Sequence, residues 1–152
     1  TKQRKLLRFY WSSPTELEQA LASGEIVAAY AWNQTLVNLK AQGLPVDMMV
    51  PKEGIFAWIA GFVMHKDCKN QDAAYDLINA WTSPESGAWL IDNYGYGSTN
   101  TKAYDLVKKE RLAELGFSRP DVVLDNSIFF QALSPEIDKK YSDLATEVQA
   151  GG

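Results

Sequence analysis

The order of apolar and polar residues predicts alternating helices and buried strands. A first helix is expected to begin within Ser12–Glu16 (SSPTE), since Ser at the cap, Pro at the first helical position and Glu closing a capping box are typical of a helix start. Gly24 is expected to end it. Residues 25–32 are then almost continuously apolar or small, as in a strand covered on both faces. Helix, glycine and buried strand in this order indicate an α/β fold.

The later part of the chain repeats these signals. The boundaries predict a helix over 34–42, strands over 46–50 and 55–64, helices over 70–81, 83–94 and 101–115, and a final amphipathic helix from Ser134. Because almost every position of 55–64 is apolar, we expect this strand at the centre of the sheet. The order of elements favours a sheet with helices on both faces and further helices toward the C-terminus.

Composition limits the class of protein without changing this picture. The 152 residues are 46% apolar and 22% charged, close to the averages of globular chains. A net charge of −4 argues against duplex nucleic acid or an anionic membrane surface as a partner. The longest apolar stretches are shorter than the ~20 residues that span a bilayer. The basic start lacks the apolar stretch of a signal peptide, so we expect an N-terminal part to be missing.

Residues with catalytic potential do not form a motif. The sequence contains no nucleophile elbow, no phosphate-binding loop and no dinucleotide fingerprint after a strand. Cys68 is the single cysteine and His65 the single histidine, which excludes an internal disulfide and a thiolate zinc site. We therefore expect no enzyme activity, metal or cofactor. The alternative is a small α/β enzyme that uses Glu53, His65 or Cys68 as its reactive group.

Aromatic residues are the unusual part of this sequence, which has five Trp and seven Tyr. Trp81 and Trp89 lie on apolar helical stripes, which favours packing in the core. Trp32 and Trp58 instead lie near the ends of predicted strands, where α/β sheets place ligand crevices. Their faces could stack on an apolar or cationic small molecule, or simply pack against other side chains. As a third class, exposed aromatics could form a protein interface.

A series of short segments has a recognisable order and spacing from about Leu6 to Gly151. The segments are LASGEI at 21–26, Trp32-Asn33, PKEG at 51–54, KNQDAAY at 69–75, and Gly95-Tyr96 followed by Asn100. This series resembles the C-terminal half of the bacterial spermidine/putrescine-binding proteins, the extracellular solute receptors of ABC importers. The resemblance implies an α/β fold of the type II periplasmic-binding-protein class, with a mixed sheet flanked by helices, of which this chain is an incomplete part.

The resemblance also implies how the chain is divided between two lobes that close on a solute. Residues 1–32 would provide the last helix and strand of one lobe. Residues 33–54 would form the return crossing at the hinge, and 55–152 the C-terminal part of the other lobe. The implied partners are a small amine-containing ligand, the membrane permease, and either a missing N-terminal half or a swapped dimer mate. The implied location is the periplasm or the cell surface.

The resemblance places pocket aromatics at Trp32, Trp58 and Tyr96. Ala60 stands where polyamine receptors have an Asp that pairs with a ligand ammonium, and without a carboxylate a buried ammonium binds less well. The family resemblance implies a polyamine as the ligand. The missing carboxylate favours the alternative, a less cationic solute such as 4-aminobutyrate, an amino acid or an opine-like molecule.

Neutral hydrogen bonds are the other expected feature of the site. Thr35 takes a position that is Asp in some relatives and is likewise uncharged. Together with Asn33 and Gln131 it could bond the less cationic kind of solute, or these three residues could serve only as caps and surface polar groups.

Overall fold

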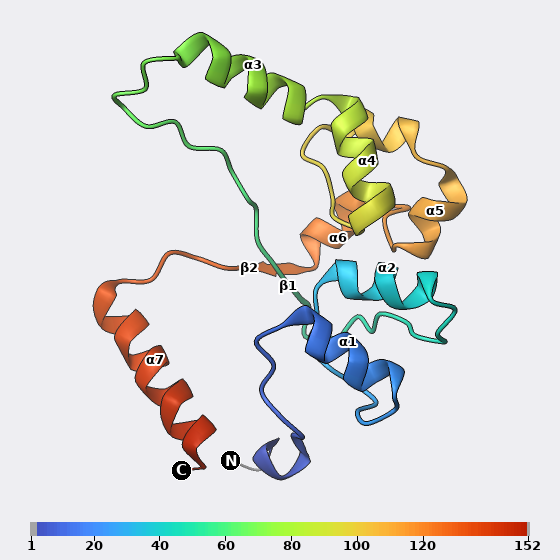
Figure 1. Ribbon diagram of the computed structural model, residues 1–152, viewed down its shortest axis with the longest axis vertical. Helices are drawn as coiled ribbons and strands as arrows, with labels where there is room; N and C mark the ends of the chain where they lie inside the picture. The colour runs from blue at the N-terminus through green and yellow to red at the C-terminus, as the bar shows by residue number, and fades with distance from the viewer. Residues whose placement is uncertain (1–2, 152) are drawn as a thin grey trace. The chain divides into compact units, whose positions relative to one another are not determined.

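The computed structural model describes residues 3–151 and is dominated by helices (Figure 1). In chain order the elements are η1 (Gln3–Leu6), α1 (Pro14–Ala22), α2 (Asn33–Ala41), β1 (Ile55–Ala57), α3 (Gln71–Trp81), α4 (Pro84–Tyr94), η2 (Thr101–Leu106), α5 (Lys109–Glu114), α6 (Pro120–Asp125), β2 (Ser127–Phe129) and α7 (Pro135–Ala150). The strands pair in parallel, and together with the helices they confirm the expected α/β class. The chain divides into two compact units, residues 32–129 and residues 1–31 with 130–152.

The core of the unit formed by residues 32–129 lies where α4 packs on η2 and the segment after it. Its buried members are Ile91, Ala103, Val107, Leu115 and Phe117. Helix α4 approaches η2 so closely that a Cβ on Gly87 would lie 2.8 Å from Ala103 Cβ and 2.5 Å from Ser98 Oγ. Glycine is therefore required at position 87 by the contact between these elements.

The parallel pair of strands joins residues far apart in the sequence. Ile55, Phe56 and Ala57 lie opposite Ser127, Ile128 and Phe129. The strand predicted over 55–64 thus forms only in its first three residues, and β2 was not predicted. A strand exists where a neighbour receives its backbone hydrogen bonds, and β2 reaches no further than Phe129.

The strands predicted over 25–32 and 46–50 are wrong for the same reason. Residues 25–32 are irregular chain with bends at Glu25 and Val27, residues 46–50 have no regular structure, and within residues 3–151 no neighbouring strand pairs with either segment. Their apolar residues remain in solvent, with Val27 96% and Met49 79% exposed. An apolar pattern shows which side chains a segment could bury, but a strand forms only where a second strand pairs with its backbone.

The helix predictions are largely confirmed, because helix signals are local. Ser83 Oγ accepts the N–H of Ser86 at 3.2 Å at the start of α4, and Ser134 Oγ accepts the N–H of Ile137 at 3.4 Å at the start of α7. The capping box of α1 is wrong, since Ser13 makes no side-chain cap bond to any described residue. The helix predicted over 101–115 is interrupted at Val107, whose extended backbone separates η2 from α5.

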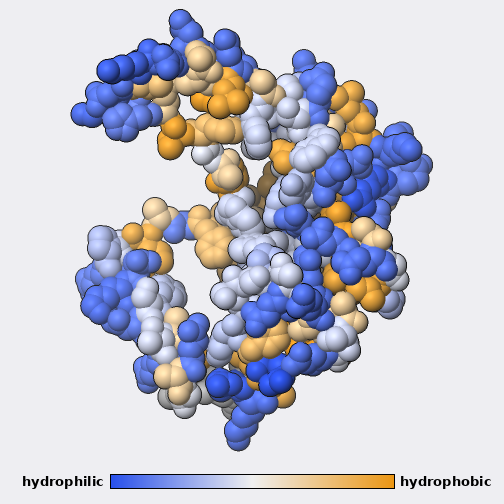
Figure 2. Space-filling model, viewed as in Figure 1, coloured by the Kyte–Doolittle hydropathy of each residue, from blue (hydrophilic) through white to orange (hydrophobic). Residues whose placement is uncertain are grey.

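Large apolar side chains remain at the surface of this unit (orange in Figure 2), on α3 and on the extended chain before it. They include Ile59, Val63 and Leu77, exposed by 67%, 96% and 62%. Trp81 and Trp89 are 53% and 56% exposed, so the prediction that they pack in the core is wrong.

The unit formed by residues 1–31 and 130–152 contains η1, α1 and α7. Leu17 and Ala20 are buried on α1. The segment before α1 is held to the segment after it by Arg8 Nε, which donates to Glu25 Oε1 at 2.7 Å, and by Trp11 Nε1, which donates to the carbonyl of Tyr30 at 2.9 Å. Of the apolar stripe of helix α7, Ile137, Tyr141 and Leu144 are exposed and Val148 is half-buried.

Candidate functional site

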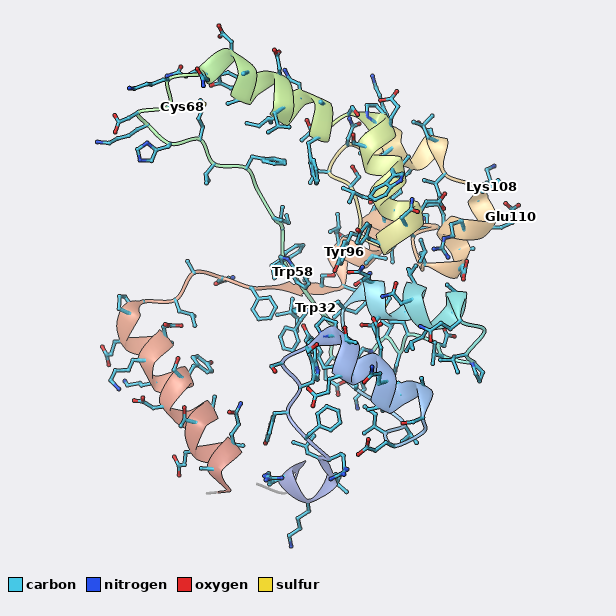
Figure 3. The ribbon with its side chains drawn as sticks, in the orientation of Figure 1. Trp32, Trp58, Cys68, Tyr96, Lys108 and Glu110 are labelled. Carbon is cyan, nitrogen blue, oxygen red and sulfur yellow. The ribbon has the colours of Figure 1, made fainter. Side chains whose placement is uncertain are left out.

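Trp32 and Trp58 lie against one another in the unit of residues 32–129 (Figure 3). Their ring centroids are 4.7 Å apart and their planes make an angle of 71°, an edge-to-face arrangement. Trp32 immediately precedes α2, and Trp58 immediately follows β1. The structure therefore brings together two residues separated by 26 positions, both at the ends of elements.

The backbone explains why each ring lies at an element boundary. Trp32 has φ −80° and ψ 154°, which is extended backbone, and Asn33 begins α2. An indole has no oxygen to accept the first N–H groups of the helix, so Trp32 supplies a ring at this end rather than a cap. At the other position, β1 ends at Ala57 because β2 ends at Phe129, and Trp58 is the first residue beyond the sheet. Trp58 is 45% exposed.

Tyr96 lies on the loop after α4, close to the start of α2. Gly95 ends α4 in the left-handed conformation with φ 68°. A Cβ on Gly95 would lie 3.0 Å from Val37 Cγ2 and 3.6 Å from Asn33 Cβ, so this loop packs on the first turns of α2. The ring of Tyr96 stacks on Tyr94, with centroids 6.2 Å apart and planes at 12°. Burial, and secondarily the neighbouring Tyr94, raises the pKa of Tyr96, so its phenol stays protonated near neutral pH.

The loop that carries Tyr96 is fixed by Tyr104, which the sequence analysis did not single out, and by Asn100, which belongs to the series of segments that carries the resemblance. Tyr104 Oη accepts the N–H of Ser98 at 3.1 Å. Asn100 Nδ2 donates to the carbonyl of Thr82 at 2.8 Å, and its Oδ1 accepts the N–H of Lys102 at 3.2 Å. The only sequence signal for this anchoring was Asn100, a residue type typical of helix caps.

Thr35 is the most buried of the predicted site residues, with 3% of its surface exposed. It is the third residue of α2, and its N–H donates to the carbonyl of Trp32 at 3.0 Å. Its Oγ1 is buried and has no hydrogen-bond partner within residues 3–151. Asn33, the first residue of α2, is half-buried.

The other predicted site residues are more exposed. Ala60 lies in the extended chain after β1, two residues beyond Trp58, and offers only a methyl group. Gln131 is exposed and belongs to the unit of residues 1–31 and 130–152. None of the predicted site residues is acidic. These residues would therefore offer a cation only aromatic rings and neutral polar groups.

The residues considered for catalysis lie in or beside turns, where Glu53 and His65 are exposed and Cys68 is half-buried. His65 Nδ1 accepts the N–H of Asp67 at 3.2 Å, and its carbonyl accepts the N–H of Cys68 at 3.0 Å. The imidazole is 77% exposed, and the side chain of Glu53 is 70% exposed beside Lys52. In the described part of the chain no group of three or more His, Cys, Asp and Glu is placed to hold a metal ion. No helix among the described residues is both long and apolar enough to cross a membrane.

Comparison with known proteins points to one family. The family described as bacterial extracellular solute-binding protein matches residues 1–115. The chain is 29% identical over 156 aligned residues to the putrescine-binding periplasmic protein PotF of Escherichia coli (strain K12), which covers 99% of this chain and 42% of that protein. It is 30% identical over 88 residues to the spermidine/putrescine-binding periplasmic protein 1 of Haemophilus influenzae, covering 58% of this chain and 24% of that protein.

A third relative is the putrescine/cadaverine-binding protein of Pseudomonas aeruginosa. It is 26% identical over 109 residues, which cover 66% of this chain and 31% of that protein. The chain thus spans less than half the length of these relatives.

Proposed function

Because this chain belongs to the bacterial extracellular solute-binding protein family, we propose that it is part of the solute receptor of an ABC importer. The receptor binds a polyamine or a related small amine-containing solute between two lobes and does not transform it. The relatives whose names include putrescine, cadaverine or spermidine support this solute class. The observation that carries the proposal is the contact of Trp32 with Trp58 beside the loop of Tyr96 and the start of α2.

Aromatic rings suit an aliphatic amine for two physical reasons. The face of a Trp ring attracts an ammonium, and its apolar surface covers the methylene chain between charged groups. The rings of Trp32 and Trp58 touch one another, so a solute must replace an edge-to-face contact worth about 0.5–1.5 kcal/mol. That contact keeps the two rings together until a solute with greater affinity for them enters.

A less cationic solute is the second candidate for the same receptor. Where an ammonium is buried without a carboxylate, it loses a charge-assisted hydrogen bond. Ala60 and Thr35 offer a methyl and a hydroxyl group at positions where the family resemblance implies an Asp in other receptors. A solute such as 4-aminobutyrate, another amino acid or an opine-like molecule carries fewer positive charges and fits such a lining better.

The rest of the receptor is proposed to come from another polypeptide segment. The chain aligns with 42% of the relative from Escherichia coli. Residues 1–32 would belong to one lobe, 33–54 to the hinge return and 55–152 to the other lobe. A missing N-terminal half or a swapped dimer mate would complete both lobes, and the membrane permease would receive the solute. The proposed location is the periplasm or the cell surface.

The proposed function is tested by removing each ring. Trp32→Ala and Trp58→Ala should each weaken solute binding by about 10-fold or more, since each removes one aromatic face. Isothermal titration calorimetry with putrescine, spermidine and 4-aminobutyrate measures the change. Trp81→Ala is the matched control, because Trp81 is exposed on α3 beside Phe62. This variant is expected to leave solute affinity unchanged. Unaltered binding in both site variants would overturn the placement of the site.

The proposed receptor binds its solute without changing it chemically, and this is tested separately. Nuclear magnetic resonance of a bound solute over time should show no chemical change. A turnover that disappears in His65→Ala or Cys68→Ala, while affinity persists, would favour the small-enzyme alternative.

A further inference from the structure

The first turn of α2 contains a buried hydroxyl group that lacks a partner. Thr35 is 3% exposed, and within residues 3–151 no group bonds its Oγ1. A threonine in a helix usually bonds the carbonyl four residues earlier, here that of Ala31, but Thr35 does not. Buried polar side-chain atoms are nearly always hydrogen-bonded, so an exception in a candidate binding site points to a partner supplied from outside the protein.

The same turn is the positive end of a helix. α2 has nine residues, and the first N–H groups of a helix have no acceptor within it. The aligned peptide dipoles add a partial positive charge at this end, which favours an anion. The Cα–Cβ bonds of a helix tilt toward its N-terminus, so Cβ of Thr35 lies on the side of the turn that carries these N–H groups. The N–H of Thr35 already donates to the carbonyl of Trp32, but the N–H groups before it are donors for which Trp32 supplies no side-chain acceptor.

We propose that the N-terminus of α2 binds the carboxylate of the solute through Thr35 Oγ1 and the N–H groups of Asn33 and Gln34. This inference rests on the proposed function and narrows its solute to an ω-amino carboxylate, whose ammonium lies on Trp32 and Trp58. A diamine at the same place would set one ammonium against the positive end of α2 and leave the hydroxyl donor unused. Because Oγ1 is buried, the carboxylate reaches it only when solute entry displaces the side chains that cover it.

A matched pair of solutes tests this inference. 4-Aminobutyrate and putrescine have nearly the same length, and they differ in carrying a carboxylate or a second ammonium. Isothermal titration calorimetry on the purified full-length protein should give an affinity for 4-aminobutyrate about 10-fold or more above that for putrescine. Thr35→Val keeps the shape of the side chain and removes the hydroxyl. It should lower the affinity for 4-aminobutyrate by about 10-fold or more, the effect of one charge-assisted hydrogen bond.

Thr15→Val is the control variant. Thr15 is exposed in the first turn of α1, another nine-residue helix, and this variant should bind both solutes as the wild type does. A thermal melt checks that Thr35→Val is folded, as expected when an unpaired buried hydroxyl is removed. If that variant does not fold, the preference of the wild type still decides.

The outcomes separate this inference from the proposed function. Tighter binding of putrescine, or unchanged binding of 4-aminobutyrate by folded Thr35→Val, overturns the carboxylate site and leaves the solute receptor standing. Binding of neither solute, nor of any other amine or amino acid, overturns the receptor and the carboxylate site together.

Discussion

At the scale of single residues, we expect Ala60 to limit how much positive charge the candidate site accepts. A carboxylate at this position would lie two residues beyond Trp58 and could pair with a ligand ammonium, whereas the methyl group cannot. We therefore predict that Ala60→Asp strengthens the binding of putrescine and spermidine by about 10-fold or more, the effect of a charge-assisted hydrogen bond. Calorimetry on the wild type and the variant measures the difference.

A charge control accompanies this variant. Ala145→Asp changes the net charge by the same amount on an exposed position of α7, and it should leave diamine affinity unchanged. Equal affinities in the wild type and Ala60→Asp would contradict the placement of Ala60 in the site.

Single residues also show what the sequence could and could not predict about the site. Trp32 and Trp58 were selected because they lie at the ends of predicted strands, and they are in contact although one of those strands does not form. Their role in binding stays a prediction. The unpartnered hydroxyl of Thr35 was beyond sequence reasoning, because burial and pairing depend on what the fold places around a side chain. Trp81 and Trp89 show the converse, since an apolar helical stripe does not guarantee that another element covers it.

At the scale of elements, the close contact between α4 and η2 holds the core of the unit of residues 32–129. Gly87→Ala would place a methyl group 2.8 Å from Ala103 Cβ and 2.5 Å from Ser98 Oγ. Alanine favours a helix over glycine by about 1 kcal/mol, but overpacking costs about 1–3 kcal/mol. We predict a lower melting temperature, measured by circular dichroism. Gly61→Ala is the control, because no atom lies within 4 Å of its added methyl group, and an equal melting temperature in both variants would contradict this packing.

Elements differ in how far the sequence predicts them, and the reason is the range of the interactions that form them. The helices α4 and α7 begin at Ser83 and Ser134, whose hydroxyls bond N–H groups three residues away. The strand β1 needs β2, which lies 70 residues further along the chain and is only three residues long. A short strand with a distant partner leaves little periodicity to detect, whereas a cap is written next to the helix it starts.

At the scale of the whole molecule, the exposed apolar surface is the feature that demands explanation. In the unit of residues 32–129, Ile59, Val63 and Leu77 are 62–96% exposed, and globular proteins rarely leave large apolar patches in water. The chain also matches less than half the length of its relatives. The proposed missing half or swapped dimer mate would cover these side chains and provide strands that pair with segments that have no partner strand in the described structure, such as 25–32.

We therefore predict that the chain associates with a partner, and native mass spectrometry tests this. We expect the purified chain to be a dimer, or a complex with a complementing chain, and to retain a small solute of the size that such pockets enclose. If the state is a dimer, its melting temperature should rise with protein concentration, because association stabilises the folded form by mass action. Val63→Lys should weaken association, since it puts a charged side chain at an apolar position that is 96% exposed and that the partner would bury.

A solute-free monomer of 17.0 kDa that melts cooperatively, at a temperature independent of concentration, would show that the chain folds alone. The division of residues 1–32 and 55–152 between two lobes would then be wrong, because neither part would need a partner to complete it.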